Sequence, residues 1–290
     1  MSHSFYPIRC NDFEDFVAKV GEHTQKPEPG RGDKPQSKTD HWIFRGQQEA
    51  QWDLRTSLER VYERFGVEGN DRLTVERRMI REFQRRLHHY TSDVPDERSL
   101  DEWMALMQHH GAPTRLLDFT YSPYVAAYFA FEKAERKSAV AIWAVNTDWL
   151  ERHLKCRFDN LYEPYLSYQA RREAQAFNTV FMCARRKLVL SVNPFRLNDR
   201  LTYQRGVFLC PGDITVGFMD NLSDFMDEKG PDQKVIQFTI PAGYEGEVGN
   251  CALERLDQMN ISRITLFPGL DGFAQSFPPK TRFFLNQRWP

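Results

Sequence analysis

In the first half of the chain, apolar residues recur every three or four positions, which is the spacing of one buried face of an amphipathic helix. A short strand, Trp42 to Gly46, interrupts this pattern. The predicted helices are a short one capped by Asn11, one from about Thr74 to Tyr90, one from Ser99 to Gly111, and one from Ser122-Pro123 to about Lys137. Because the last of these is apolar almost all round, we expect it to lie deep in the core.

Strands dominate the second half, where runs of β-branched and aromatic residues alternate with helical segments. The predicted strands are Ala139–Val145, Lys187–Val192, Gly206–Cys210, Lys234–Ile240 and Ile264–Phe267, and the predicted helices lie near Asp148–Leu154, Tyr165–Ala184, Phe218–Glu228 and Glu247–Met259. Strands separated by irregular helices favour an α+β fold over a regular βαβ series.

The segment from Glu22 to Asp40 is rich in Pro, Gly, Lys and Gln and has no large apolar residue. It cannot bury much surface, so it is expected to form a mobile surface loop. This divides an N-terminal helix and loop, residues 1–40, from a body formed by residues 41–290. Because the body shows no further linker, we expect a single mixed domain.

Composition narrows the class of protein further. The 290 residues are 41% hydrophobic with a net charge of −1, as in a globular protein without global attraction to nucleic acid. The five cysteines are odd in number and form no CxxC pair, which argues against a disulfide framework and a thiolate metal site. The N-terminus lacks a secretory pattern and no apolar run reaches the length of a membrane span, so a cytoplasmic location without membrane contact is expected.

Charge is nevertheless unevenly distributed. From Arg152 to Lys187 there are eight Lys or Arg against three acids, and the segment from Pro211 to Asp257 carries ten acids against three bases. The predicted helix at Thr74–Tyr90 also has a basic face, formed by Arg77, Arg78, Arg81, Arg85 and Arg86. These stretches are either solvated faces or, where basic, surfaces that hold a phosphate, a nucleic acid or a protein partner.

The phosphate loop and the common zinc-protease, dinucleotide and hydrolase motifs are absent from the sequence. Arg45 stands out because it lies in an apolar strand, WIFRGQ. A buried arginine needs an acceptor, so Arg45 either pairs with an acid such as Asp118 or binds an anionic ligand. Gly46 would let a ligand or another backbone approach closely.

A second polar cluster runs from Gln108 to Asp118 and contains His109, His110, Thr114 and Arg115. Such density in a loop is typical of a site, although the histidines could instead cap the helix end and Arg115 could pair with Asp118. A third element, Gln204 before the apolar Gly206–Cys210, either points an amide into a cleft or merely starts a strand.

Together these elements resemble the FRG domain, a family named for its Phe-Arg-Gly. The matching segments are Phe44-Arg45-Gly46, QHHGAPTRLLDFT (Gln108 to Thr120), SPYVAAYFA (Ser122 to Ala130), Gln204-Arg205-Gly206-Val207-Phe208 and ITLFPGLDG (Ile264 to Gly272). The resemblance spans roughly Trp42 to Phe277.

A more distant resemblance is to ADP-ribosyltransferases, which carry an aromatic-Arg-Gly strand, a Ser/Thr-rich strand end before a helix, and a late glutamate. Here Phe44-Arg45-Gly46, then Thr120-Tyr121-Ser122 with Val125, Ala126 and Phe129, and then Gln204 are similar in order and spacing. The resemblance implies a split sheet with surrounding helices and NAD as substrate. Arg45 would hold phosphate and a hydroxyl at Thr120 or Ser122 would brace the ribose.

Gln204 stands where those enzymes have a carboxylate. Either Asp118 or Glu132 opposes the charge of the transition state instead, or the site is weak or only binds. On this interpretation the catalytic candidates are Arg45, Ser122, Gln204 and Asp118, and the NAD-binding candidates are Phe44, Gly46, His109, His110, Thr114, Arg115, Thr120 and Tyr121.

Three hypotheses follow from the sequence. The first is an NAD-dependent ADP-ribosyltransferase acting on a protein or nucleic acid, as a toxin or phage-defence effector. The second is a non-catalytic FRG binding module that holds nucleic acid or a protein partner through the basic helices. The third is a hydrolase in which His109 or His110 acts as a base oriented by Asp118.

Overall fold

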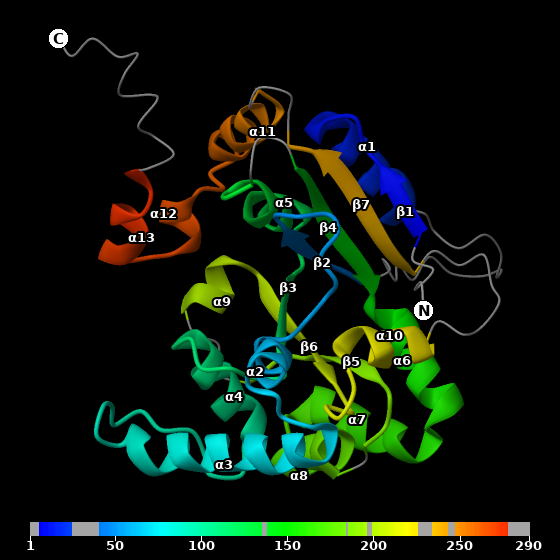
Figure 1. Ribbon diagram of the computed structural model, residues 1–290, viewed down its shortest axis with the longest axis vertical. Coiled ribbons are helices and arrows are strands. Elements are labelled where there is room, and N and C mark those ends of the chain that lie inside the picture. Colours follow the sequence, from blue (N-terminus) through cyan, green and yellow to red (C-terminus); the bar gives the residue numbers. More distant parts are fainter. Residues whose placement is uncertain are drawn as a thin grey trace.

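The computed structural model of the chain describes residues 6–24, 41–134, 138–183, 185–195, 199–225, 234–242 and 247–277. In these residues seven strands form one sheet in the order β1-β7-β4-β2-β3-β6-β5 (Figure 1). The strands are β1 (Tyr6–Arg9), β2 (Trp42–Gln47), β3 (Leu117–Thr120), β4 (Ala139–Asn146), β5 (Val189–Val192), β6 (Gly206–Pro211) and β7 (Val235–Pro241). Among the strands of the described residues, β1 and β7 pair in parallel and all other neighbours are antiparallel. Helices and a mixed sheet confirm the predicted α+β class.

The sheet opens between β2 and β3. These strands share a single residue pair, Phe44 opposite Thr120. By contrast, β2 pairs with β4 along its whole length, from Trp42 opposite Asn146 to Gln47 opposite Ala141. The sheet therefore consists of two well-paired parts, β1-β7-β4-β2 and β3-β6-β5, joined at one narrow point.

Strand β4 is apolar from Ala139 to Val145 because both of its faces are covered. Val140, Ile142 and Ala144 pack into one hydrophobic cluster, and the alternating residues Ala141, Trp143 and Val145 into another. This follows from the two-residue period of a strand. A strand buried on both sides loses the alternation of apolar and polar residues, which explains the run AVAIWAV.

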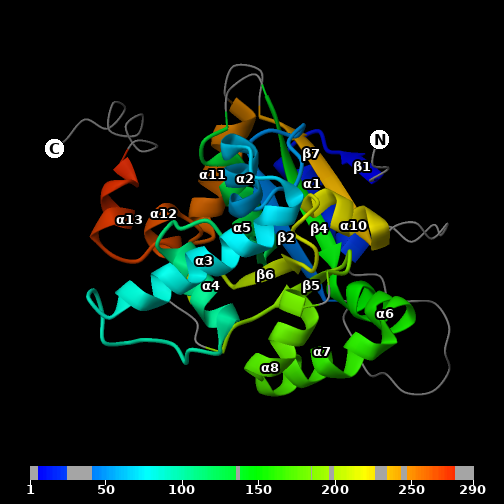
Figure 2. The same ribbon diagram turned by 60° about the horizontal axis from the view of Figure 1, so that its bottom comes forward.

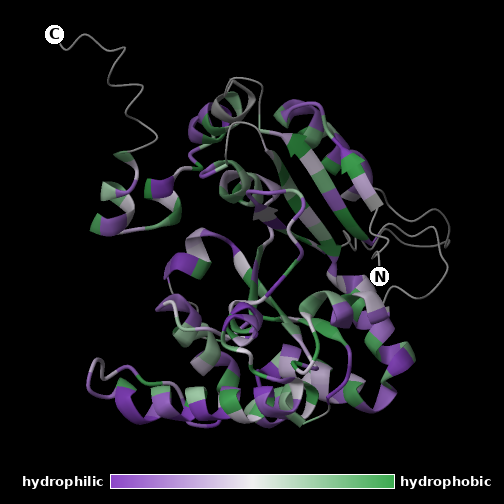
Figure 3. Ribbon diagram, viewed as in Figure 1, coloured by the Kyte–Doolittle hydropathy of each residue, from purple (hydrophilic) through white to green (hydrophobic). Residues whose placement is uncertain are grey.

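Helices α1 (Phe13–Thr24), α5 (Pro123–Phe131) and α11 (Glu247–Gln258) build the first cluster on one face of the sheet. The other face is covered by α3 (Gly69–Leu87), α4 (Leu100–His109), α6 (Thr147–Arg157), α7 (Asp159–Arg171), α8 (Ala174–Phe177), the π-helix η1 (Asn178–Cys183) and α10 (Phe218–Phe225). Figure 2 shows α6, α7 and α8 on the side of the sheet away from α1 and α11. Figure 3 shows α3 as a largely hydrophilic helix with short hydrophobic bands.

The N-terminal residues belong to the same sheet as the body. Strand β1 pairs with β7, and Phe13 and Phe16 of α1 are buried against the first cluster. The predicted helix after Asn11 is therefore confirmed as α1, which extends to Thr24 and includes the first residues of the predicted loop. The rest of that loop, residues 25–40, lies outside the described residues.

Several predicted elements have different bounds. Helix α3 begins five residues before the predicted Thr74, and the helix predicted at Tyr165–Ala184 is divided at Arg172, whose φ of 55° ends α7. The strand predicted at Ile264–Phe267 is wrong. Those residues overlap the short helix α12 (Arg263–Leu266), where the Ser262 amide donates to Thr265 Oγ1 at 3.0 Å.

Five further elements escaped the sequence pattern: β1, α2 (Ser57–Phe65), β3 and the short helices α9 (Asp199–Tyr203) and α13 (Leu270–Ala274). In the described parts of the chain, no helix has the length and apolar character needed to cross a membrane. All five cysteines are free.

Candidate functional site

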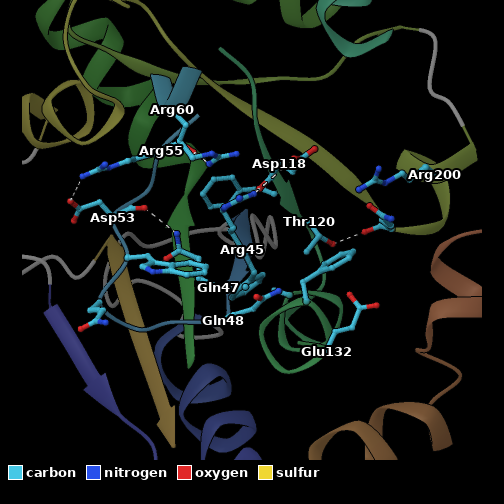
Figure 4. A pocket seen from close by; sticks show the side chains of 18 of the residues that line it. Arg45, Gln47, Gln48, Asp53, Arg55, Arg60, Asp118, Thr120, Glu132 and Arg200 are labelled. Carbon is cyan, nitrogen blue, oxygen red and sulfur yellow. Dashed lines mark hydrogen bonds and ion pairs between the residues drawn. The ribbon is translucent and has the colours of Figure 1, made fainter. Parts of the chain in front are cut away.

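A cleft of about 800 Å³ lies where β2 and β3 separate. Its size falls within the range of small-molecule sites. The walls come from β2 and the loop after it, from β3, α2, α5 and the segment around α9 (Figure 4). The lining residues are Phe44, Arg45, Gly46, Gln47, Gln48, Gln51, Trp52, Asp53, Arg55, Arg60, Glu63, Asp118, Phe119, Thr120, Ala126, Phe129, Glu132, Arg200 and Gln204.

Arg45 lies in the middle of this cleft and bridges the two parts of the sheet. Its Nη1 donates to the Asp118 main-chain oxygen at 2.7 Å and lies 4.0 Å from Asp118 Oδ2. The side chain is 22% exposed, and its buried Nε has no hydrogen-bond partner among the described residues. Burial lowers the pKa of Arg45, the Asp118 charge opposes this shift and Arg60 adds to it. Arg45 is therefore a charged group whose hydrogen-bond donors are only partly used within the described residues.

The other two residues of the Phe-Arg-Gly tripeptide serve packing. Phe44 is buried in the cluster that includes α5. A Cβ on Gly46 would lie 1.9 Å from the Ala126 carbonyl oxygen and 2.7 Å from the Ala130 nitrogen. Glycine is needed here because the α5 backbone contacts β2 directly. Both residues line the cleft, but of the three only Arg45 offers a polar side chain.

Thr120 and Gln204 join the cleft wall to the C-terminal helices. Thr120 Oγ1 donates to the Gln204 carbonyl at 2.7 Å and accepts from the Ser122 amide at 3.1 Å. The Gln204 side chain donates through Nε2 to the Leu266 carbonyl at 3.1 Å. Gln204 thus lines the cleft, while its side-chain amide holds α12 in place.

The cleft carries equal numbers of basic and acidic side chains, namely Arg45, Arg55, Arg60 and Arg200 against Asp53, Glu63, Asp118 and Glu132. Arg55 forms ion pairs with two of the acids on one wall, at 3.0 Å from Glu63 and 3.7 Å from Asp53. Figure 4 shows Arg55 and Asp53 on one side of Arg45, and Thr120, Glu132 and Arg200 on the other. The carboxylate of Asp118 is 56% exposed.

Glu132 is the most sheltered carboxylate of the cleft with respect to solvent. Its side chain is 10% exposed, forms an ion pair with Arg263 and accepts from the Tyr128 hydroxyl at 3.0 Å. Burial and then the charge of Glu132 raise the pKa of Tyr128, so the phenol stays protonated and donates. Arg263 and Tyr128 therefore fix a negative charge on the wall near Thr120.

Two of the residues predicted for the site lie beside the cleft rather than in it. Ser122 is the N-cap of α5 and accepts from the Val125 amide at 3.3 Å, so its hydroxyl is used by the helix. Tyr121 is partly exposed and donates its amide to the Arg205 carbonyl at 3.0 Å. Neither residue lines the cleft.

The two histidines end α4 on the surface, with ring centroids 4.9 Å apart. Burial lowers the pKa of His109, and the charges of His110 and Arg200 lower it further. Within the described residues neither ring hydrogen-bonds to Asp118, which contacts Arg45 instead. The base–carboxylate pair of the hydrolase hypothesis is therefore not formed.

Thr114 and Arg115 were expected to bind the ligand, but they lie in the core. Arg115 is 1% exposed, donates from Nε to Glu76 Oε1 at 2.6 Å and from Nη1 to the Phe181 carbonyl at 2.7 Å. Burial alone would lower the pKa of Arg115, but the charge and hydrogen bonds of Glu76 raise it above its usual value. The Thr114 amide donates to Ser57 Oγ at 3.0 Å. This motif fastens β3 to α2 and α3.

Sequence reasoning missed the wall formed by the loop after β2 and by α2. This wall contributes Gln47, Gln48, Gln51, Trp52, Asp53, Arg55, Arg60 and Glu63. A signal was present: Thr56, followed by Glu59 three residues later, has the capping-box pattern of a helix start, and Thr56 Oγ1 accepts from the Glu59 amide at 3.1 Å. No comparable signal in the sequence marked Arg200. It lies on α9, a five-residue helix before β6, which is too short to show a helical pattern.

Comparison with known proteins gives one family match. The model of the FRG domain matches residues 40–139. The match includes Arg45, Asp118, Thr120 and Glu132, but not Arg200 or Gln204, and so it is narrower than the span expected from Trp42 to Phe277. No curated protein and no solved structure matches the chain.

Proposed function

The chain contains an FRG domain over residues 40–139, and we propose that its cleft binds NAD and transfers ADP-ribose from NAD to a protein or nucleic-acid acceptor. The observation that carries this proposal is the incompletely satisfied Arg45 at the opening of the sheet. A guanidinium with free donors in a shielded cleft favours binding of a phosphate group.

The arrangement of elements supports the same ligand. Arg45 lies on β2, Thr120 ends β3 before α5, and Gln204 precedes β6. The Thr120–Gln204 hydrogen bond brings the last two together, and the Phe44–Thr120 pair joins them to the first. In our proposal this is the split sheet of an ADP-ribosyltransferase. The pyrophosphate would contact Arg45, with Arg60 and Arg200 on the flanking walls.

The proposed reaction breaks the bond between C1′ of the ribose and the nicotinamide nitrogen. Nicotinamide leaves with the bonding electron pair, an acceptor oxygen or nitrogen attacks C1′, and the acceptor loses a proton. Positive charge develops on the ribose, and a fixed carboxylate in a shielded site stabilises it. We assign this role to Glu132, because its low exposure limits screening by water. Asp118 would position Arg45.

A binding-only version of the cleft is the second candidate. It is favoured by the engagement of both acids, since Asp118 lies next to Arg45 and Glu132 is paired with Arg263. A carboxylate already neutralised by an arginine opposes a developing cation less well. Such a module would hold NAD or a related nucleotide without breaking it.

Transfer of ADP-ribose onto a target, by contrast, suits a toxin or phage-defence effector because it modifies that target covalently.

The test is incubation of the full chain with NAD labelled in its adenylate part, together with cell protein, DNA and RNA, while free nicotinamide is measured. The variants are Arg45→Ala and Glu132→Gln, and the matched control is Arg81→Ala, which removes an exposed arginine from α3. Label and nicotinamide that depend on Arg45 and Glu132 but not on Arg81 support transfer. Binding of NAD without nicotinamide release supports the second candidate. Absence of binding contradicts both.

A further inference from the structure

A second concave surface lies between α3 and the end of α4, and we call it the α3 groove. It has a volume of about 530 Å³ and is lined by Val75, Arg78, Met79, Glu82, Phe83, Arg86, Leu87, Tyr90, Met107 and Ala112. No residue lines both this groove and the cleft. Figure 1 shows α3 at the lower edge of the molecule, away from β2 and α5.

The floor of the α3 groove is apolar. Val75, Met79, Phe83 and Leu87 repeat every four residues along α3 and form one row. Phe83 rests on Trp103 with ring centroids 6.3 Å apart, so the floor is continuous with the core. At 1.5 Å per residue this row is about 18 Å long, which matches about three turns of a second helix. Methionine in such a floor adapts to different side chains.

The rim of the α3 groove is basic. Among the residues that line the groove, the exposed Arg78 and Arg86 are basic and Glu82 is the only acid. The other arginines of this stretch, Arg77, Arg81 and Arg85, lie two positions after floor residues and so face away from the groove. Glu82 is already engaged, at 2.6 Å from Arg86 and 3.7 Å from Arg85. The rim therefore has an excess of positive charge beside the apolar floor.

We propose that the α3 groove binds an amphipathic, acidic helix of a partner protein. Apolar side chains at the i, i+3 or i+4, and i+7 positions of that helix would fill the groove. Its acidic residues would meet the arginines of the rim, which sets the orientation and speeds the encounter. Tyr90, 83% exposed at the end of the groove, supplies an amphipathic ring of the type that anchors protein interfaces.

Two other occupants fit the α3 groove less well. A second copy of this chain joined symmetrically would place the same patch on both sides, so that arginine rows would face each other. A nucleic acid would use the arginines, but the apolar floor offers no hydrogen-bond partner for a base edge, and its one ring, Phe83, already packs edge-to-face with Trp103. The combination of a dry floor with a basic rim favours a protein helix.

The test starts from a phage library that displays random peptides of about 16 residues, enough to span the floor with an extra turn. Peptides are selected on the full chain and counter-selected on Arg78→Glu/Arg86→Glu, and the best peptide is synthesised. A polyuridine RNA is measured in parallel. Tyr90→Ser tests the apolar contact at the end of the groove and should weaken binding, because the exposed ring can be removed without disturbing the core. The control is Arg64→Glu/Arg171→Glu, which reverses two exposed arginines on α2 and α7.

We expect the selected peptides to combine apolar residues at helical spacing with acidic flanks. Reversal of Arg78 and Arg86 is expected to weaken binding at least about tenfold, as charge reversals in an interface do, and the control pair is expected to leave it unchanged. Added salt should weaken binding as well. Absence of enrichment, peptides without acidic residues, or binding indifferent to Arg78 and Arg86 would overturn the proposal. Tighter binding of RNA through the same arginines would also overturn it.

Discussion

Arg45 Nη1 donates to the main-chain oxygen of Asp118 across the one point where two neighbouring strands share a single residue pair. A side chain thus takes the place of the backbone hydrogen bonds that β2 and β3 do not form. The opening of the sheet is therefore spanned by a side chain rather than by strand pairing. The same side chain also places a partly buried positive charge at the centre of the cleft.

Arg45 is expected to be a functional residue that does little for stability. Because burial lowers its pKa, the folded state disfavours the charged guanidinium. Arg45→Met keeps most of the volume and removes the charge, and it should leave the free energy of unfolding unchanged or raise it by up to about 1 kcal/mol. Binding of NAD should be lost. Urea unfolding and calorimetric titration measure the two effects, and a large loss of stability would contradict this assignment.

Arg115 is expected to behave in the opposite way. Its pKa is raised by Glu76, so the folded state favours the charged form. Arg115→Met leaves Glu76 buried without its partner and should lower the free energy of unfolding by about 3–5 kcal/mol. The double change Arg115→Met/Glu76→Leu should recover most of this loss. If both arginine variants show the same stability in urea, the distinction between them is wrong.

Gly46 offers a test of packing between β2 and α5. In Gly46→Ala the new Cβ would lie 1.9 Å from the Ala126 carbonyl oxygen, so the helix would have to move. We expect a loss of about 2–3 kcal/mol, typical of overpacking in a core. Gly21→Ala is the matched control, because its Cβ would have nothing within 4 Å and the helix α1 should gain up to about 1 kcal/mol. Thermal unfolding of both variants measures the contrast.

The sequence predicted β2, α5 and the class of the fold because each rests on local signals. The apolar run around Arg45 marks a strand, and Ser122-Pro123 marks a helix start that the structure confirms at Pro123. The sequence did not reveal β3, since four residues with a polar Asp118 are too few to show a period. Partners far apart in sequence were equally hidden. The polar cluster before β3 suggested a ligand site, but Arg115 meets Glu76, a helix residue among ordinary charged neighbours.

Stability should depend on pH through His109. Its pKa lies below the ordinary 6.5, so the folded state binds fewer protons than the unfolded state as the pH falls. The contribution of neutral His109 is present above 6.5 and is lost as the pH falls through the lowered pKa. His109→Gln should therefore lose less stability than the unmodified chain between about pH 7.5 and about pH 5. Urea denaturation of both proteins at the two pH values measures this difference. An equal loss of stability in His109→Gln and the unmodified chain would count against this explanation.

Gln204→Glu separates the role of position 204 in the proposed reaction from its role in the fold. A carboxylate at position 204 would stand where ADP-ribosyltransferases carry one. If the variant kept the fold unchanged, it should therefore release nicotinamide faster. The structure favours another outcome, because the Gln204 amide donates to the Leu266 carbonyl and a carboxylate cannot.

In Gln204→Glu a carboxylate oxygen would face the Leu266 carbonyl oxygen, which should lower the free energy of unfolding by about 1–3 kcal/mol and loosen α12. Phe267, the residue after α12, stacks with two arginines: its ring centroid lies 4.9 Å from the Arg200 guanidinium and 4.4 Å from that of Arg263. Because Arg263 also holds Glu132, the same loosening should slow release of nicotinamide in Gln204→Glu. Glu132→Gln should abolish release of nicotinamide, and limited proteolysis measures how far α12 loosens when Arg263 loses this partner. Faster release in Gln204→Glu, with Glu132→Gln still active, would move the carboxylate role from Glu132 to position 204.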